Sequence, residues 1–262
     1  MSDKNDFYIG WKNEMPPKSK SLIKKILIPL FVFAPILFLV IVLLQKPFNN
    51  HLFEFGTTSE ITGTYFHTPF PMLIADDQMV KEGLSKDILL VGYGKFGAEG
   101  TMNLIQEKNG NLNGKKITLQ GTLTYGGGKT ILELTQEEAS FLKIENQSTA
   151  QSPLKTPSPI SVKGEIIDPK CYFGVMKPGE GKVHKSCATR CISGGIPPVL
   201  RRETGDAKTP FQYYLLVDQK GGNINKEILP FIAEQVSIAG MTSSFSSWDV
   251  LYINVKDLKL VK

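Results

Sequence analysis

The chain has 262 residues, of which 41% are hydrophobic, and its formal net charge at pH 7 is +5. This charge is modest and partly belongs to a basic segment near the amino terminus, and no basic stripe interleaved with aromatic residues follows it. We therefore expect no nucleic-acid partner.

An apolar segment near the amino terminus predicts a membrane helix. Residues 26–44 read ILIPLFVFAPILFLVIVLL, without a charge, and about twenty apolar residues in a helix cross a hydrocarbon core. Pro29 and Pro35 are tolerable in a spanning helix. The segment is longer than the apolar core of a cleavable signal peptide, and no A-x-A-like site follows it. We predict an uncleaved transmembrane helix over residues 23–46, held in the bilayer.

The distribution of lysines around this segment predicts its orientation. Four lysines closely precede the span and one follows it: Lys18, Lys20, Lys24, Lys25 and Lys46. Basic residues stay on the cytoplasmic side. Residues 1–22 are therefore predicted to form a cytoplasmic tail, and the chain beyond the helix is predicted to lie outside the cytoplasm.

The outer part divides at a polar, proline-containing stretch, which we interpret as a linker over residues 146–159. It separates residues 47–145 from residues 160–262, each of a common domain size. Both halves contain short runs of alternating or massed apolar residues between glycine-containing turns, which is typical of strands. In the second half we expect a helix over residues 225–235.

The stretch VGYGKFG, residues 91–97, has the G-x-G-x-x-G spacing of a dinucleotide site. Such a site also needs a βαβ unit and an acidic residue about twenty positions on. The segment after Gly97 is too short and contains too many glycines to indicate a crossover helix. We therefore expect a turn here.

The two halves resemble each other, which predicts an internal repeat. Gly63 and Gly121 are 58 positions apart in the first half, whereas Gly164 and Gly240 are 76 positions apart in the second. The extra 18 positions match the size of the cysteine-containing segment, so we predict a duplicated β module with an insertion. An early strand with a central glycine and a closing V-x-I-x-G-x strand resemble an OB-fold barrel. The predicted fold is mainly β, with a single transmembrane helix followed by two tandem OB-like β-barrel domains.

The second half contains a motif that resembles one in exported bacterial OB-like domains, G-x-I-x-D-x-x-C-Y followed by H-x-x-C-A-x-x-C-x-x-G-G-I-P-P. Here the motif comprises Gly164, Ile166, Asp168, Cys171, Tyr172, His184, Cys187, Ala188, Cys191 and residues 194–198. The resemblance implies export and an OB-like fold, but no particular activity. With the predicted orientation, it places the domains on the periplasmic side of a bacterial inner membrane.

The cysteine segment offers a set of metal ligands. A helix from Lys182 to the glycines at 194 and 195 would bring His184, Cys187 and Cys191 within about 60° around its axis. Cys171, at the end of the preceding strand, could approach this face. The four side chains would form a Cys₃His site suited to zinc or to copper(I), with Met176 as a reserve ligand.

A competing interpretation is a disulfide between Cys171 and either Cys187 or Cys191, because the outside of the cell is oxidising. A bridge between Cys187 and Cys191 is disfavoured, since side chains four apart on a helix are poorly directed for it. One cysteine would remain, and an odd thiol suggests a ligand, reactivity or intermolecular pairing.

Two functions remain open from the sequence. In the first, the chain is a membrane-anchored accessory protein whose Cys/His metal-binding or redox centre supports a membrane electron-transfer complex. In the second, it is a disulfide-stabilised OB-like binding or assembly module without catalytic chemistry. No arrangement typical of a hydrolase stands out, and a thiol catalyst remains as the enzymatic alternative, so the sequence leaves enzymatic activity open and favours a role without it.

Overall fold

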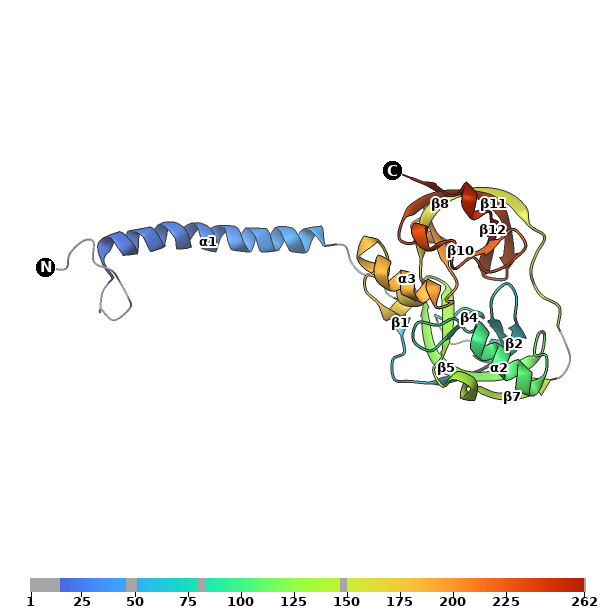
Figure 1. Ribbon diagram of the computed structural model, residues 1–262. Coiled ribbons are helices and arrows are strands. Elements are labelled where there is room, and N and C mark those ends of the chain that lie inside the picture. Colours follow the sequence, from blue (N-terminus) through green and yellow to red (C-terminus); the bar gives the residue numbers. More distant parts are fainter. Residues whose placement is uncertain (1–14, 46–50, 80–82, 147–149, 262) are drawn as a thin grey trace. The chain divides into compact units, whose positions relative to one another are not determined.

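The computed structural model describes residues 15–45, 51–79, 83–146 and 150–261 (Figure 1). The chain divides into two units, Met1–Phe48 and Asn49–Lys262. In the first unit, helix α1 (Pro17–Leu44) contains Pro29 and Pro35. It is long and apolar enough to cross a membrane, in agreement with the predicted membrane-spanning segment.

The first barrel closes through five strands that neighbour one another in the order β2-β3-β4-β6-β5. They are β2 (Ser59–Phe66), β3 (Met72–Ala75), β4 (Asp87–Gly92), β5 (Lys116–Gly126) and β6 (Lys129–Leu134). Strands β4 and β6 are parallel, and the other pairs are antiparallel. Two further strands, β1 (Leu52–Phe53) and β7 (Phe141–Asn146), pair with β5 in antiparallel fashion. Helix α2 (Glu99–Asn109) precedes β5, and 3₁₀ turns cover Asp77–Met79 and Glu137–Ser140.

The second barrel repeats this topology, with the closed order β8-β9-β10-β12-β11. Its strands are β8 (Ser158–Ile167), β9 (Val199–Glu203), β10 (Phe211–Asp218), β11 (Gln235–Phe245) and β12 (Trp248–Ile253), and β13 (Lys259–Leu260) extends β11. Strands β10 and β12 are the parallel pair. Short 3₁₀ turns cover Leu229–Phe231 and Val255–Asp257. The prediction of a mainly β protein with two OB-like barrels is confirmed.

The four glycines that suggested the repeat occupy equivalent positions in the two barrels. At each of them a Cβ atom would lie 2.2–2.3 Å from a carbonyl oxygen of the neighbouring strand: Ile74 for Gly63, Arg201 for Gly164, Glu133 for Gly121 and Tyr252 for Gly240. Real Cβ atoms do not approach this closely. The same steric requirement therefore recurs at the same two points of each barrel.

The barrels differ most in the connection between their first two strands. Residues 67–71 join β2 to β3, whereas residues 168–198 join β8 to β9. The longer connection contains a π-helical turn (Cys171–Val175), a 3₁₀ turn (Lys182–His184) and helix α3 (Lys185–Ser193), drawn in orange in Figure 1. The cysteine segment is thus an insertion into the repeated barrel, as the glycine spacing predicted.

Two helix predictions were wrong. Within residues 225–235, the 3₁₀ turn at Leu229–Phe231 replaces the expected helix, since Pro230 lies in it and Ala233 has a positive φ of 57°. Residues 99–109, which we expected not to form a helix, are α2. Its glycines do not interrupt it, because Gly100 lies in the first turn and Gly110, with φ of 77°, ends it.

Among the described residues, three apolar cores hold the second unit together. One fills the first barrel and one fills the second. The third takes side chains from both barrels and includes Met72 and Leu89 from the first, and Phe173, Tyr213 and Trp248 from the second. Because the two barrels share this core, residues 49–262 form one compact unit.

Candidate metal centre

The cysteine segment begins with a cap formed by Asp168, which directly follows β8. Its Oδ1 accepts a hydrogen bond from the Lys170 amide at 3.0 Å, and its carbonyl accepts one from the Tyr172 amide at 3.0 Å. These bonds start the π-helical turn that positions the buried Cys171. Turns of this kind are frequent at functional sites.

The second part of the segment is α3, which carries Cys187 and Cys191 one turn apart. The helix ends at the predicted glycines: the Gly194 amide donates to the Arg190 carbonyl at 3.0 Å, and Gly195 has a positive φ of 100°. His184 lies in the 3₁₀ turn before α3.

The three cysteine sulfurs converge. The Sγ atoms of Cys171, Cys187 and Cys191 all lie within 4.8 Å of one another, and all three cysteines are free thiols. Cys171 and Cys191 are buried, whereas Cys187 is partly exposed. The geometry thus offers a cluster of three sulfur ligands that solvent can reach at Cys187.

His184 belongs to a second group of ligand atoms. The imidazole, a carboxylate oxygen of Asp168 and the sulfur of Cys171 lie within 4.8 Å of one another. Cys171 is therefore common to both groups. Sequence reasoning did not identify Asp168 as a ligand, although its place three residues before Cys171 in the motif was a signal.

Hydrogen bonding, burial and nearby charges shift the pKa values of the side chains in this region. Hydrogen bonding to Cys191, burial, and the nearby Asp168 carboxylate hold the pKa of the Cys171 thiol well above its ordinary value. Burial lowers the pKa of His184, which favours the neutral imidazole that binds metals. A positively charged ion would relieve the cost of ionising Cys171.

The first barrel contributes a lysine to the cysteine cluster. Lys95, in the turn between β4 and α2, places its Nζ 3.0 Å from the Sγ of Cys187 and 3.9 Å from the Sγ of Cys191. The hydrogen bond to Cys187 raises the pKa of Lys95, so the lysine is charged at neutral pH.

The turn that carries Lys95 docks against the end of α3 through glycines. The Gly97 amide donates to the Gly194 carbonyl at 3.0 Å. A Cβ atom at Gly97 would lie 2.1 Å from the Gly195 carbonyl oxygen, and one at Gly194 would lie 2.1 Å from that of Lys95. Gly97 of the VGYGKFG stretch and Gly194 at the end of α3 therefore allow the two backbones to approach each other.

A second lysine crosses between the barrels in the opposite direction. Lys170, next to Cys171, reaches into the first barrel and donates to the Glu133 carboxylate at 2.6 Å and to the Gly94 carbonyl at 2.6 Å. Both charged side chains are buried. The Gly94 amide also donates to Glu133 at 3.0 Å, so one buried network fixes both the turn that carries Lys95 and the start of the cysteine segment.

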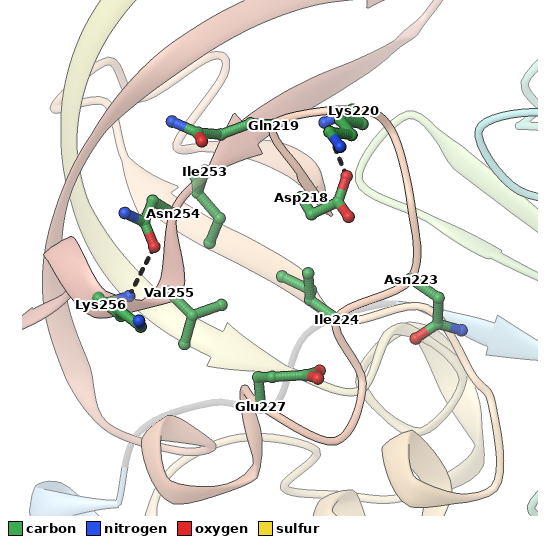
Figure 2. Close-up of a pocket in the computed structure, with 10 residues that line it drawn as sticks. All are labelled: Asp218, Gln219, Lys220, Asn223, Ile224, Glu227, Ile253, Asn254, Val255 and Lys256. Atoms are coloured by element: carbon green, nitrogen blue, oxygen red, sulfur yellow. Dashed lines mark hydrogen bonds between the residues drawn. The ribbon is translucent and has the colours of Figure 1, made fainter.

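A cavity of about 450 Å³ lies elsewhere on the second barrel (Figure 2). Ile224, Ile253 and Val255 are among its apolar lining. Two of the polar side chains around it cap local turns: Asp218 Oδ1 accepts from the Lys220 amide at 2.7 Å, and Asn254 Oδ1 accepts from the Lys256 amide at 3.2 Å. In the described part of the chain, the groups of three candidate metal ligands lie around Cys171 and not around this cavity.

The donor atoms around Cys171 fit a metal ion of the soft or borderline class. Three thiolates suit copper(I) or zinc, and a set with thiolate, imidazole and carboxylate suits zinc.

Comparisons of this chain with protein-family models, with curated proteins and with solved structures find no match.

Proposed function

We propose that this chain is a membrane-anchored accessory protein that binds a zinc or copper(I) ion through Cys171, Cys187 and Cys191. The observation that carries the proposal is the convergence of three free sulfurs, from two separate elements, within 4.8 Å of one another. Cys187 provides an exposed edge through which an ion can enter.

The proposal places the metal centre on the periplasmic side of a bacterial inner membrane, where it supports a membrane electron-transfer complex. Helix α1, which is long and apolar enough to span a bilayer, supports the membrane location. The excess of lysines before the span supports the outward orientation. The motif's resemblance to those of exported bacterial domains is consistent with both.

Metal content of the full chain tests the proposal. We expect the reduced, metal-free protein in detergent to bind Zn²⁺ or copper(I) with an affinity that survives dialysis. Cys187→Ser should lower the amount of bound metal, because it removes a ligand while leaving the buried cysteines in place. Ser186→Ala is the matched control, since Ser186 is exposed on the same helix and is not one of the proposed ligands.

Thiol counting separates this function from the disulfide-stabilised binding module. Purified, metal-free protein under non-reducing conditions should show three reactive thiols after unfolding. A single reactive thiol with Cys171 bridged, or zinc binding that Cys187→Ser leaves unchanged, would contradict the proposed function.

A carboxyl-terminal fusion tests the orientation. A reporter enzyme that is active only outside the cytoplasm should be active when fused after residue 262. Activity of a cytoplasm-only reporter at the same position would place the thiols in a reducing compartment and contradict the periplasmic assignment.

A further inference from the structure

Two buried polar atoms beside Cys171 have no hydrogen-bond partner within the described part of the chain. They are Oδ2 of Asp168 and Nε2 of His184. Asp168 is fully buried and His184 is 3% exposed. Buried polar atoms are nearly always paired, and an unpaired one commonly marks the place of an ion or a water.

The local structure holds both side chains in place. Oδ1 of Asp168 is occupied by the Lys170 amide, which leaves Oδ2 free to bind another group. The His184 amide donates to the Gly181 carbonyl at 3.0 Å, which fixes the turn that carries the imidazole. The Cys171 sulfur lies within 4.8 Å of ligand atoms from both residues. Oxygen, nitrogen and sulfur donors around one point form a typical zinc ligand set.

We propose that Cys171 bridges two metal ions. The first is the ion bound with Cys187 and Cys191, and the second is a borderline divalent ion such as Zn²⁺ bound with Asp168 and His184. The inference rests on the proposed function for the first ion and adds a second site to it. A thiolate sulfur has enough lone pairs to bind both ions.

Geometry favours two ions over one. An ion with ligands at about 2.0–2.3 Å requires all of its ligand atoms to lie within about 4 Å of one another. The five candidate residues do not form one such group: they separate into two groups of three that share Cys171. The ligand atoms of each group lie within 4.8 Å of one another, so one ion could satisfy a group once its ligands move slightly closer together, and two ions are needed to satisfy both.

Charge also favours two ions. Three thiolates and the Asp168 carboxylate together carry four negative charges, which two divalent ions neutralise. One divalent ion bound by the three thiolates would leave two uncompensated negative charges, one of them on the buried Asp168 carboxylate, which is costly. The partly solvated Lys95 would balance at most one of them.

The number of Zn²⁺ ions bound per full-length chain tests the inference. The reduced wild-type protein in detergent, dialysed against buffered Zn²⁺, should bind two ions. Asp168→Asn keeps the oxygen that accepts the Lys170 amide but removes the carboxylate, and should bind one. His184→Ala should also bind one. Cys171→Ser should lose both ions because it removes the shared ligand.

Asp218→Asn is the matched control. Asp218, like Asp168, caps a turn by accepting a backbone amide two residues on, but it lies outside both ligand groups, so this variant should still bind two ions. Substitution with Co²⁺ gives a second readout: two ions that share a thiolate should couple magnetically, and their paramagnetic resonance signal should be weaker than that of two separate ions.

The outcomes separate the two proposals. One zinc per wild-type chain, lost in Cys187→Ser and retained in Asp168→Asn, would overturn the second site and leave the proposed function standing. Two zinc ions in Asp168→Asn, or two uncoupled Co²⁺ ions, would overturn the bridge. Absence of bound zinc and copper(I) in the wild type would overturn both proposals.

Discussion

The two barrels have the same strand order and the same sterically required glycines, yet the chemistry gathers in the second. The difference lies in one connection: residues 67–71 in the first barrel and residues 168–198 in the second. The barrel therefore acts as a scaffold: a site can be inserted between two of its strands without altering how the strands pair. The first barrel keeps a role in the site, because it supplies Lys95 and the pocket for Lys170.

The largest expected effect concerns the buried ion pair between Lys170 of the insertion and Glu133 of the first barrel, which we expect to contribute most to holding the barrels together. Lys170→Met should lower the free energy of unfolding by about 3–5 kcal/mol, because it leaves the buried Glu133 without its ion-pair partner. Chemical denaturation of the full chain measures this. The double variant Lys170→Met/Glu133→Leu should recover much of the loss. A single variant as stable as the wild type would show that the buried pair does not hold the barrels together.

The equivalence of the two barrels can be tested at their glycines. Gly63→Ala and Gly164→Ala should each cost about 1–3 kcal/mol, because the new Cβ atom would overlap a strand carbonyl in either barrel. Gly100→Ala is the control: nothing lies within 4 Å of its Cβ position in α2, and alanine favours helix, so stability should stay the same or rise. A large loss of stability in only one of the two variants would show that the two barrels are not sterically equivalent at these glycines.

The two lysines that cross between the barrels should contribute differently to the free energy of unfolding. Lys95→Met should cost at most about 1 kcal/mol of stability, because exposed polar pairs contribute little and Lys95 is exposed. The same denaturation experiment that is used for Lys170 measures it. A loss as large as that of Lys170→Met would mean that the contact with the thiols, rather than the buried pair, joins the barrels.

The smallest expected effect concerns the attachment of the insertion to its own barrel. Glu234 pairs with Lys182 and Lys185 at the start of α3, and these lysines lower the pKa of Glu234 below its ordinary 4.5. A carboxylate with a lowered folded-state pKa stabilises the fold above its unfolded pKa, and this contribution is lost as the pH falls through the folded pKa. Glu234→Gln should therefore unfold slightly more easily than the wild type at pH 7, and this difference should shrink as the pH falls below 4.5 and through the lowered folded-state pKa. A difference that stays the same as the pH falls would contradict this role.

Local patterns predicted the barrels, the repeat and the convergence of the cysteines, because each depends on spacing within one segment. The predicted helical face that included His184 was less successful. α3 begins at Lys185, and the 3₁₀ turn before it places the imidazole with Asp168. A preference for one kind of short turn over another is too small to predict from residue spacing.

Contacts between the barrels could not be predicted, because they depend on how two folded surfaces meet. Lys95 lies in a stretch that the sequence presents as a turn, and it lies 92 positions from Cys187. Glu133 lies 37 positions from Lys170 and belongs to the other barrel. The two wrong helix predictions, at α2 and at residues 225–235, have a local cause instead. Glycine and proline act differently at the end of a helix than in its middle.

The docking of Gly97 against Gly194 has a consequence for how the protein is made. The chain emerges from its amino terminus, and domains fold in that order, so the first barrel and its turn at residues 92–97 are complete before the three cysteines appear. The surface that covers α3 is then ready when the thiols arrive. We expect the interval in which these cysteines are exposed to oxidation to be short, since the partner surface that shields them has already been synthesised.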